Sequence, residues 1–146
     1  MLRRAGPTGP VRSKSNSERR EDAVIKLVYI CYRRADFTPE AFYDRWLNVH
    51  GPLVKSVAKQ IGARRYVQSH KLDTPVNEQL REARGMPEPY DGITEVWWNS
   101  MDDLIQAAET DAGRDAMQRL VEDEAEFLDL EKSCIFMSEE HTIFEF

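Results

Sequence analysis

The stretch FTPEAFYDRWLNVHGPLVKSVAKQIG, residues Phe37–Gly62, decides the fold. Its apolar side chains recur every three or four positions, which is the spacing of a buried helix face: Phe42, Trp46, Val49, Leu53, Val57 and Ile61. Thr38 is the expected N-cap, Pro39 suits the first helical position, and Gly62 suits the C-terminal stop. The pattern predicts a long helical segment that packs on a core.

Pro52 interrupts this helical pattern. Proline lacks the N–H that would bond the carbonyl of Asn48, and it disfavours helical angles at Gly51. We therefore expect the chain to bend or restart at His50–Pro52, with the imidazole at the bend. A half-buried, neutral His50 suits a general base or a ligand hydrogen bond. In the alternative interpretation, His50 stabilises the bend by bonding a freed carbonyl such as that of Asn48.

Length and charge restrict the class of protein. The chain has 146 residues, enough for one domain with a proper core, and a net charge of −6. Residues 1–20 hold six basic side chains and one acidic one, so the rest of the chain is strongly acidic. An acidic body argues against a nucleic-acid partner, and no apolar run has the length of a membrane-spanning helix. Two cysteines make no disulfide framework, which favours a cytoplasmic protein.

The elements that flank the Phe37–Gly62 helix indicate an α+β fold. We expect strands at Ile25–Tyr32, Ala63–Lys71, Gly92–Asn99 and within Cys134–Phe146, and helices over about 76–84, 101–109 and from the break at Gly113 to about Glu131. The main elements follow the order βαββαβ of a ferredoxin-like sheet, with both helical layers on one face. Because the first and third strands are apolar on both faces, we expect a second copy to cover the bare face in a dimeric α/β barrel.

The sequence also resembles a known family. The run FYDRWLNVHGPLV at 42–54 and the later block DGI-x-E-x-W at 91–97 are together similar to the EthD domain family of the dimeric α+β barrel superfamily. The resemblance covers about residues 25–143. It implies a homodimeric barrel with a pocket between sheet and helices, in a family associated with ether, aromatic and polyketide metabolism. We divide the chain into a disordered basic tail, residues 1–23, and an EthD-like domain, residues 24–146.

Polar and aromatic residues on the predicted elements define a candidate pocket. His50 is the candidate catalytic residue. The candidate pocket residues are Tyr32, Trp46, Tyr66, Gln68, His70, Asp91 and Trp97. Glu95 needs a partner such as Arg64 or Arg65, or else orients His50. Trp98 is expected to pack in the core or the dimer interface, and the acidic run at 122–126 is expected to be a solvated face.

Three functions are compatible with this pocket. The first is a small dimeric enzyme that binds a hydrophobic, oxygenated metabolite and transforms it by cofactor-free acid–base or oxidative chemistry, of the oxidoreductase or lyase/isomerase type. The second is a non-catalytic dimeric binding module. The third is a haem-linked oxidoreductase, since the superfamily that the chain resembles includes haem-binding members. The histidines at 50, 70 and 141 lack metal-ligand spacing, so we expect no metal site, and no cofactor motif is present.

Overall fold

The computed structural model describes Gly9, residues 12–13, Ser15 and residues 23–146. The expected basic tail, residues 1–23, lies almost wholly outside the described residues. The helices and strands are β1 (Ile25–Cys31), α2 (Pro39–Arg45), the π-helical turn η1 (Trp46–His50), α3 (Gly51–Val57), β2 (Arg65–His70), α4 (Pro75–Glu82), β3 (Gly92–Trp98), α5 (Met101–Glu109), α6 (Asp111–Ala125) and β4 (Cys134–Ser138). In the described residues, no helix is long and apolar enough to cross a membrane.

The four strands form one antiparallel sheet in the order β2-β3-β1-β4. This order confirms the predicted ferredoxin-like topology. Side chains alternate between the two faces of each strand, so the register places Tyr29 of β1 beside Thr94 of β3 and Ile135 of β4 on one face. Tyr66 lies beside Val96 on that same face. The sheet thus brings residues from all four strands together under the helices.

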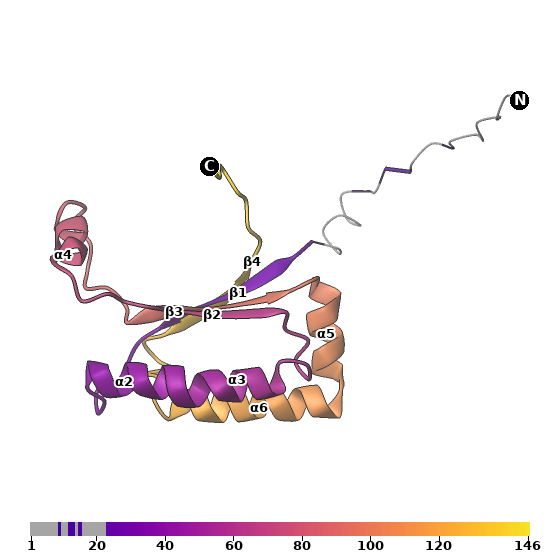
Figure 1. The fold of residues 1–146 in the computed structure, drawn as a ribbon, viewed down its shortest axis with the longest axis horizontal. Coiled ribbons are helices and arrows are strands. Elements are labelled where there is room, and N and C mark those ends of the chain that lie inside the picture. The colour runs from indigo at the N-terminus through magenta and orange to yellow at the C-terminus, as the bar shows by residue number, and fades with distance from the viewer. Residues whose placement is uncertain (1–8, 10–11, 14, 16–22) are drawn as a thin grey trace, which may run out of the picture.

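The helices α2, α3 and α6 form a layer over one face of the sheet (Figure 1). The core between the layers includes Val57 and Ile61 from the first helical segment and Leu120 from α6. Trp98 is 2% exposed and donates its indole N–H to the carbonyl of Ile61 at 2.8 Å. Trp98 therefore joins β3 to the end of the first helical segment on the helix-covered face.

The chain does not restart at His50–Pro52, one of the two predicted outcomes, because the backbone stays helical through a π turn. Gly51 keeps helical angles, φ −54° and ψ −52°, and its N–H bonds the carbonyl of Trp46, five residues back. Pro52 then lies in the first turn of α3, where a backbone N–H is not needed. The extra residue in the turn rotates the following side chains. Val49 becomes 48% exposed, against the sequence prediction, and His50 is only 4% exposed.

The π turn makes a testable distinction between Val49 and Val57. Val49→Ala is expected to change the free energy of unfolding by less than about 0.5 kcal/mol, because the side chain is exposed and alanine favours helix. Val57→Ala should cost about 2 kcal/mol, because Val57 is 3% exposed in the core. Urea unfolding of the two variants measures both values. A large cost at Val49 would contradict the π turn and restore the regular helix.

Two boundaries in the C-terminal half differ from the sequence prediction, whereas β4 lies within its predicted range. The break between helices falls at Thr110, which caps α6, while Gly113 lies inside the first turn. A Cβ at Gly113 would lie 1.8 Å from the carbonyl oxygen of Ala107, so the close corner between α5 and α6 requires glycine. Helix α6 ends at Ala125 and not near Glu131, and β4 ends at Ser138.

The opposite face of the sheet carries no helix layer (Figure 1). Val28 and Ile30 of β1, Ile93 of β3 and Phe136 of β4 adjoin one another there through the strand register. Ile93 and Phe136 are exposed. The expected two-faced apolar character of the central strands is therefore present in the structure.

Candidate active site

A cavity of about 170 Å³ lies between the sheet and the helices α3 and α6. All four strands and the helices η1, α3, α5 and α6 contribute to its lining. The residues are Leu27, Tyr29, Cys31, Trp46, His50, Val54, Ile61, Tyr66, Thr94, Val96, Trp98, Leu104, Met117, Leu120, Val121, Glu124, Phe127, Leu128 and Ile135. Most of these side chains are apolar, which suits a hydrophobic ligand, and a few polar groups converge on it.

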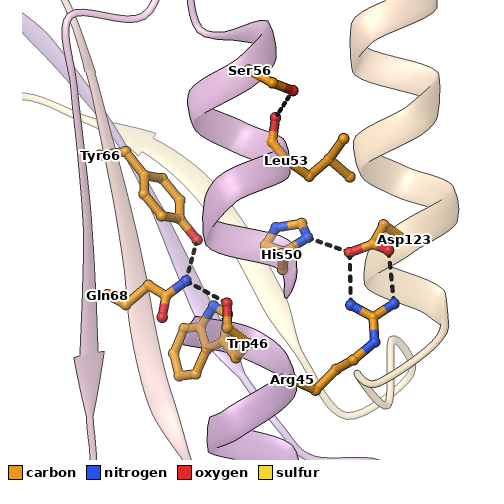
Figure 2. Close-up of polar contacts among 8 residues, drawn as sticks. All are labelled: Arg45, Trp46, His50, Leu53, Ser56, Tyr66, Gln68 and Asp123. Carbon is orange, nitrogen blue, oxygen red and sulfur yellow. Dashed lines mark hydrogen bonds and ion pairs between the residues drawn. The ribbon is translucent and has the colours of Figure 1, made fainter. Parts of the chain in front are cut away.

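His50 sits in the cavity wall and is held there by an acidic residue of α6. Its Nδ1 lies 2.7 Å from Oδ2 of Asp123. Arg45 binds the same carboxylate with two N–H groups, at 2.7 and 3.2 Å. Figure 2 shows Asp123 between the imidazole and the guanidinium, with the second ring nitrogen of His50 directed away from Asp123. Phe127 packs against the side chains of His50 and Arg45, with ring-to-ring and ring-to-guanidinium distances of 5.2 and 5.3 Å.

The charges around His50 define its protonation. Burial lowers the pKa of His50 below its usual value, and the opposing effect of Asp123 does not restore it, so the imidazole is neutral near pH 7. Burial raises the pKa of Asp123, but the hydrogen bonds from Arg45 and His50 outweigh it, and the carboxyl stays ionised. A carboxylate only accepts hydrogen bonds, so Nδ1 of His50 carries the proton. Nε2 is then an unprotonated base, and among the described residues nothing hydrogen-bonds it.

Glu124 is a second titratable group in the cavity, and the sequence prediction missed it. Burial raises the pKa of Glu124 to about 7, against the effect of a hydrogen bond with Tyr29. The prediction that the acidic run at 122–126 is a solvated face is therefore wrong for two of its residues. Asp123 is bound by Arg45 and His50, and Glu124 faces the cavity. The helical spacing of Met117, Leu120, Glu124 and Leu128 places Glu124 on the buried side of α6, and this signal was present in the sequence.

The other polar groups in the cavity are hydrogen-bond partners and not nucleophiles. Burial raises the pKa of Cys31 to about 12, so its thiol stays protonated. Burial also raises the pKa of Tyr66 above its usual value. Thr94 lies 3.9 Å from the Cys31 sulfur. These groups offer polarity without charge, whereas His50 and Glu124 are the groups able to exchange a proton near neutral pH.

Of the predicted pocket residues, Trp46 and Tyr66 line the cavity together with His50. Gln68 lies just behind them and donates to the Trp46 carbonyl at 2.8 Å and to the Tyr66 hydroxyl at 2.9 Å (Figure 2). His70 donates its Nε2–H to Oε1 of Gln68 at 2.8 Å and stacks on the Trp46 ring at 4.6 Å. Gln68 and His70 thus connect β2 to the π turn and are not part of the cavity lining.

The remaining three predicted pocket residues lie away from the cavity. Tyr32 packs edge-on against Tyr90. Asp91 accepts the backbone N–H of Arg33 at 2.7 Å, at the end of the sheet. Trp97 lies on the face without helices, because it is adjacent to Trp98 and a strand alternates its side chains. Trp98, expected to pack in the core or the dimer interface, is buried in the core and also lines the cavity.

Glu95 neither orients His50 nor pairs with Arg64 or Arg65. It lies on the bare face of the sheet and binds Lys26 at 3.0 Å. The alternative interpretation, in which His50 bonds the Asn48 carbonyl, is also wrong, because Nδ1 of His50 binds Asp123. Within the described part of the chain, no group of three or more His, Cys, Asp or Glu side chains is arranged to hold a metal ion.

Comparisons with known proteins agree with this architecture. The model of the EthD domain family matches residues 34–131. No curated protein sequence matches the chain. A solved EthD family protein from Bacillus halodurans C-125 is 19% identical with a TM-score of 0.52, over 81% of this chain and 99% of that one.

Two further solved structures share the fold. A dimeric protein of unknown function with a ferredoxin-like fold, from Bacteroides fragilis, is 13% identical with a TM-score of 0.50, over 80% of this chain and 96% of that one. SnoaB, a cofactor-independent oxygenase from Streptomyces nogalater, is 12% identical with a TM-score of 0.52, over 84% of this chain and 99% of that one. At these identities the likeness concerns the fold.

Proposed function

The chain belongs to the EthD domain family, and we propose that it binds a small hydrophobic, oxygenated metabolite and transforms it by cofactor-free proton transfer. The observation that carries this proposal is the position of His50. Its Nδ1–H is fixed by Asp123, and the residue lines an apolar cavity with its second ring nitrogen directed away from Asp123 (Figure 2). The same arrangement of carboxylate and imidazole orients general bases in many enzymes.

The cavity favours an enzyme over the non-catalytic alternative. A binding module whose interior is filled by its own side chains would leave no space beside His50. Here Trp46 and Trp98 form apolar walls, and a neutral imidazole and a carboxyl face the space between them. An apolar enclosure also strengthens each hydrogen bond to a ligand oxygen, because little water competes there.

We further propose that the protein is a homodimer. The bare sheet face exposes Ile93 and Phe136 next to Val28 and Ile30. Burial of such a face against a second copy stabilises it by roughly 25 cal/mol per Å² of apolar area. A structural neighbour with the same sheet is described as dimeric. Sedimentation of the wild type and of a Phe136→Glu variant tests this proposal. We expect a dimeric wild type and a weakened dimer in the variant, and a monomeric wild type would contradict the proposal.

The test of the chemistry uses 2-tetralone, a hydrophobic ketone with exchangeable C–H groups beside its carbonyl. We expect the protein to accelerate exchange of these protons with D₂O, followed by NMR. His50→Gln should lower this acceleration at least about 100-fold, because the general base is removed. His141→Gln is the matched control, since His141 is exposed and binds Glu139.

Thermal unfolding of His50→Gln separates chemistry from stability. A variant that melts close to the wild type and loses exchange supports the base role. A variant that keeps full exchange contradicts it. A wild-type protein that neither binds nor exchanges 2-tetralone or related phenols and β-diketones would contradict the proposed function as a whole.

A further inference from the structure

Glu124 is a cavity residue that the function proposed above does not use. Glu124 and Tyr29 of β1 both line the cavity, and the carboxyl lies close enough to the Tyr29 hydroxyl for each group to affect the pKa of the other. Among the described residues, no Lys, Arg or His forms an ion pair with Glu124, whereas its neighbour Asp123 has both Arg45 and His50. Glu124 is part-buried, and a carboxyl partly removed from water without a cation is costly to the fold. Its presence among apolar side chains calls for an explanation in terms of a ligand.

The position of Glu124 places it toward the cavity mouth. Val121, one turn before it on α6, and Ile135 on β4 both line the cavity and are both more than half exposed. Ile135 pairs with Tyr29 across the β1–β4 ladder. The cavity therefore opens between α6 and β4, beside Glu124 and Tyr29. A ligand that reaches His50 from this side passes the carboxyl.

We propose that Glu124 is a second catalytic residue of this cavity, which hydrogen-bonds a carbonyl or hydroxyl oxygen of the substrate while His50 exchanges a proton at the adjacent carbon. The inference rests on the proposed function and narrows its substrate class to compounds with an enolisable carbonyl group or its enol. The Tyr29 hydroxyl lies beside the carboxyl and orients it.

The proton transfers balance without a cofactor. Nε2 of His50 takes the proton from the carbon beside the carbonyl. The electron pair of the broken C–H bond forms the C=C bond of the enol. The carbonyl π pair moves onto oxygen, which takes the proton of the Glu124 carboxyl, so an enol, an imidazolium and a carboxylate result. In the return step His50 protonates the same or a conjugated carbon, and Glu124 recovers the O–H proton. The net reaction is exchange or isomerisation.

The titration of Glu124 suits this role. Burial raises the pKa of its carboxyl to about 7, so the acid and the carboxylate both exist near neutral pH. The titratable groups on the elements around it are Tyr29 and Cys31 on β1, His50 on η1, Tyr66 on β2 and Asp123 on α6. Burial raises the pKa of Tyr29, Cys31 and Tyr66, which stay protonated, and Asp123 stays ionised.

The first measurement compares Glu124→Gln with Glu122→Gln in the 2-tetralone exchange assay. Glu122 is exposed on the same helix and bonds Gln118, so it is the matched control. We expect Glu124→Gln to lower the exchange rate about 30-fold or more and to remove the inflection of the rate near pH 7. Glu122→Gln should match the wild type. Unchanged exchange in Glu124→Gln, with a wild type that exchanges, overturns this inference and leaves the proposed function intact.

The second measurement does not depend on turnover. At pH 7.5, binding of 2-tetralone to a neutral carboxyl requires uptake of a fraction of a proton, which calorimetry in two buffers of different ionisation enthalpy detects. We expect uptake in the wild type, Glu122→Gln and His50→Gln, and none in Glu124→Gln. Uptake that persists in Glu124→Gln, or binding without uptake in the wild type, overturns the inference. If the wild type neither binds nor exchanges the ketone, the proposed function fails first and this inference with it.

Discussion

Glu124→Gln is expected to stabilise the protein at pH 8 by up to roughly 3 kcal/mol. The reason is that the folded protein holds the Glu124 carboxyl at a pKa of about 7, well above its usual value of 4.5. Between these two values the folded state binds more protons than the unfolded state does. The stability contributed by this group is therefore complete below pH 4.5 and falls as the pH rises through 7. Glutamine has no proton to lose, so its contribution does not change over this pH range.

Urea unfolding of the wild type and Glu124→Gln between pH 5 and pH 8 checks this prediction. The difference in free energy of unfolding should be small at pH 5 and grow with pH. Glu122→Gln serves again as the control, and its difference from the wild type should not depend on pH in this range. A variant that is less stable than the wild type at pH 8 would contradict the picture of a buried carboxylate without a cation. A gain in stability with a loss of exchange is the usual relation between stability and function at an active site.

The sequence predicted the fold more completely than the site. Alternation in Ile25–Tyr32 and Gly92–Asn99 and the periodicity of the first helix follow from local preferences, and the structure keeps them within a few residues. Local preferences do not determine which side chains of the first helical segment face the core near Pro52. The π turn before Pro52 adds one residue to the turn, which moves Val49 outward and His50 inward. A fixed period of 3.6 residues does not describe such an insertion.

The site residues that the prediction missed are those whose role depends on long-range partners. Asp123 and Glu124 are adjacent in an acidic run, a pattern that indicates a solvated surface. Only the packing of α6 against η1 places Asp123 beside Arg45 and His50, 78 and 73 residues away along the chain. In the same way, the choice between Trp97 and Trp98 as the cavity wall depended on which sheet face the helices cover. Alternation alone says that the two differ and does not say which is inside.

Asp123→Asn is expected to lower the free energy of unfolding at pH 7 by about 3 kcal/mol, because it removes one charge of a largely buried pair and leaves Arg45 without its partner. Because the pKa of Asp123 is below its usual value, its contribution is present above the unfolded value of 3.8 and is lost as the pH falls through the lower folded value. Urea unfolding at pH 7 and pH 3 should therefore show a large difference from the wild type at pH 7 and a much smaller one at pH 3.

The control for Asp123→Asn is Asp44→Asn, an exposed acid on α2 that accepts a bond from Asn48. Its cost should stay below about 0.5 kcal/mol. A second variant, Arg45→Met with Asp123→Asn, should recover part of the lost stability, because no unpaired guanidinium remains. Exchange activity should not recover with it. An asparagine side chain both donates and accepts, so it no longer requires the proton to lie on Nδ1 of His50. In the other tautomer the proton lies on Nε2, and Nε2 is then no longer an unprotonated base.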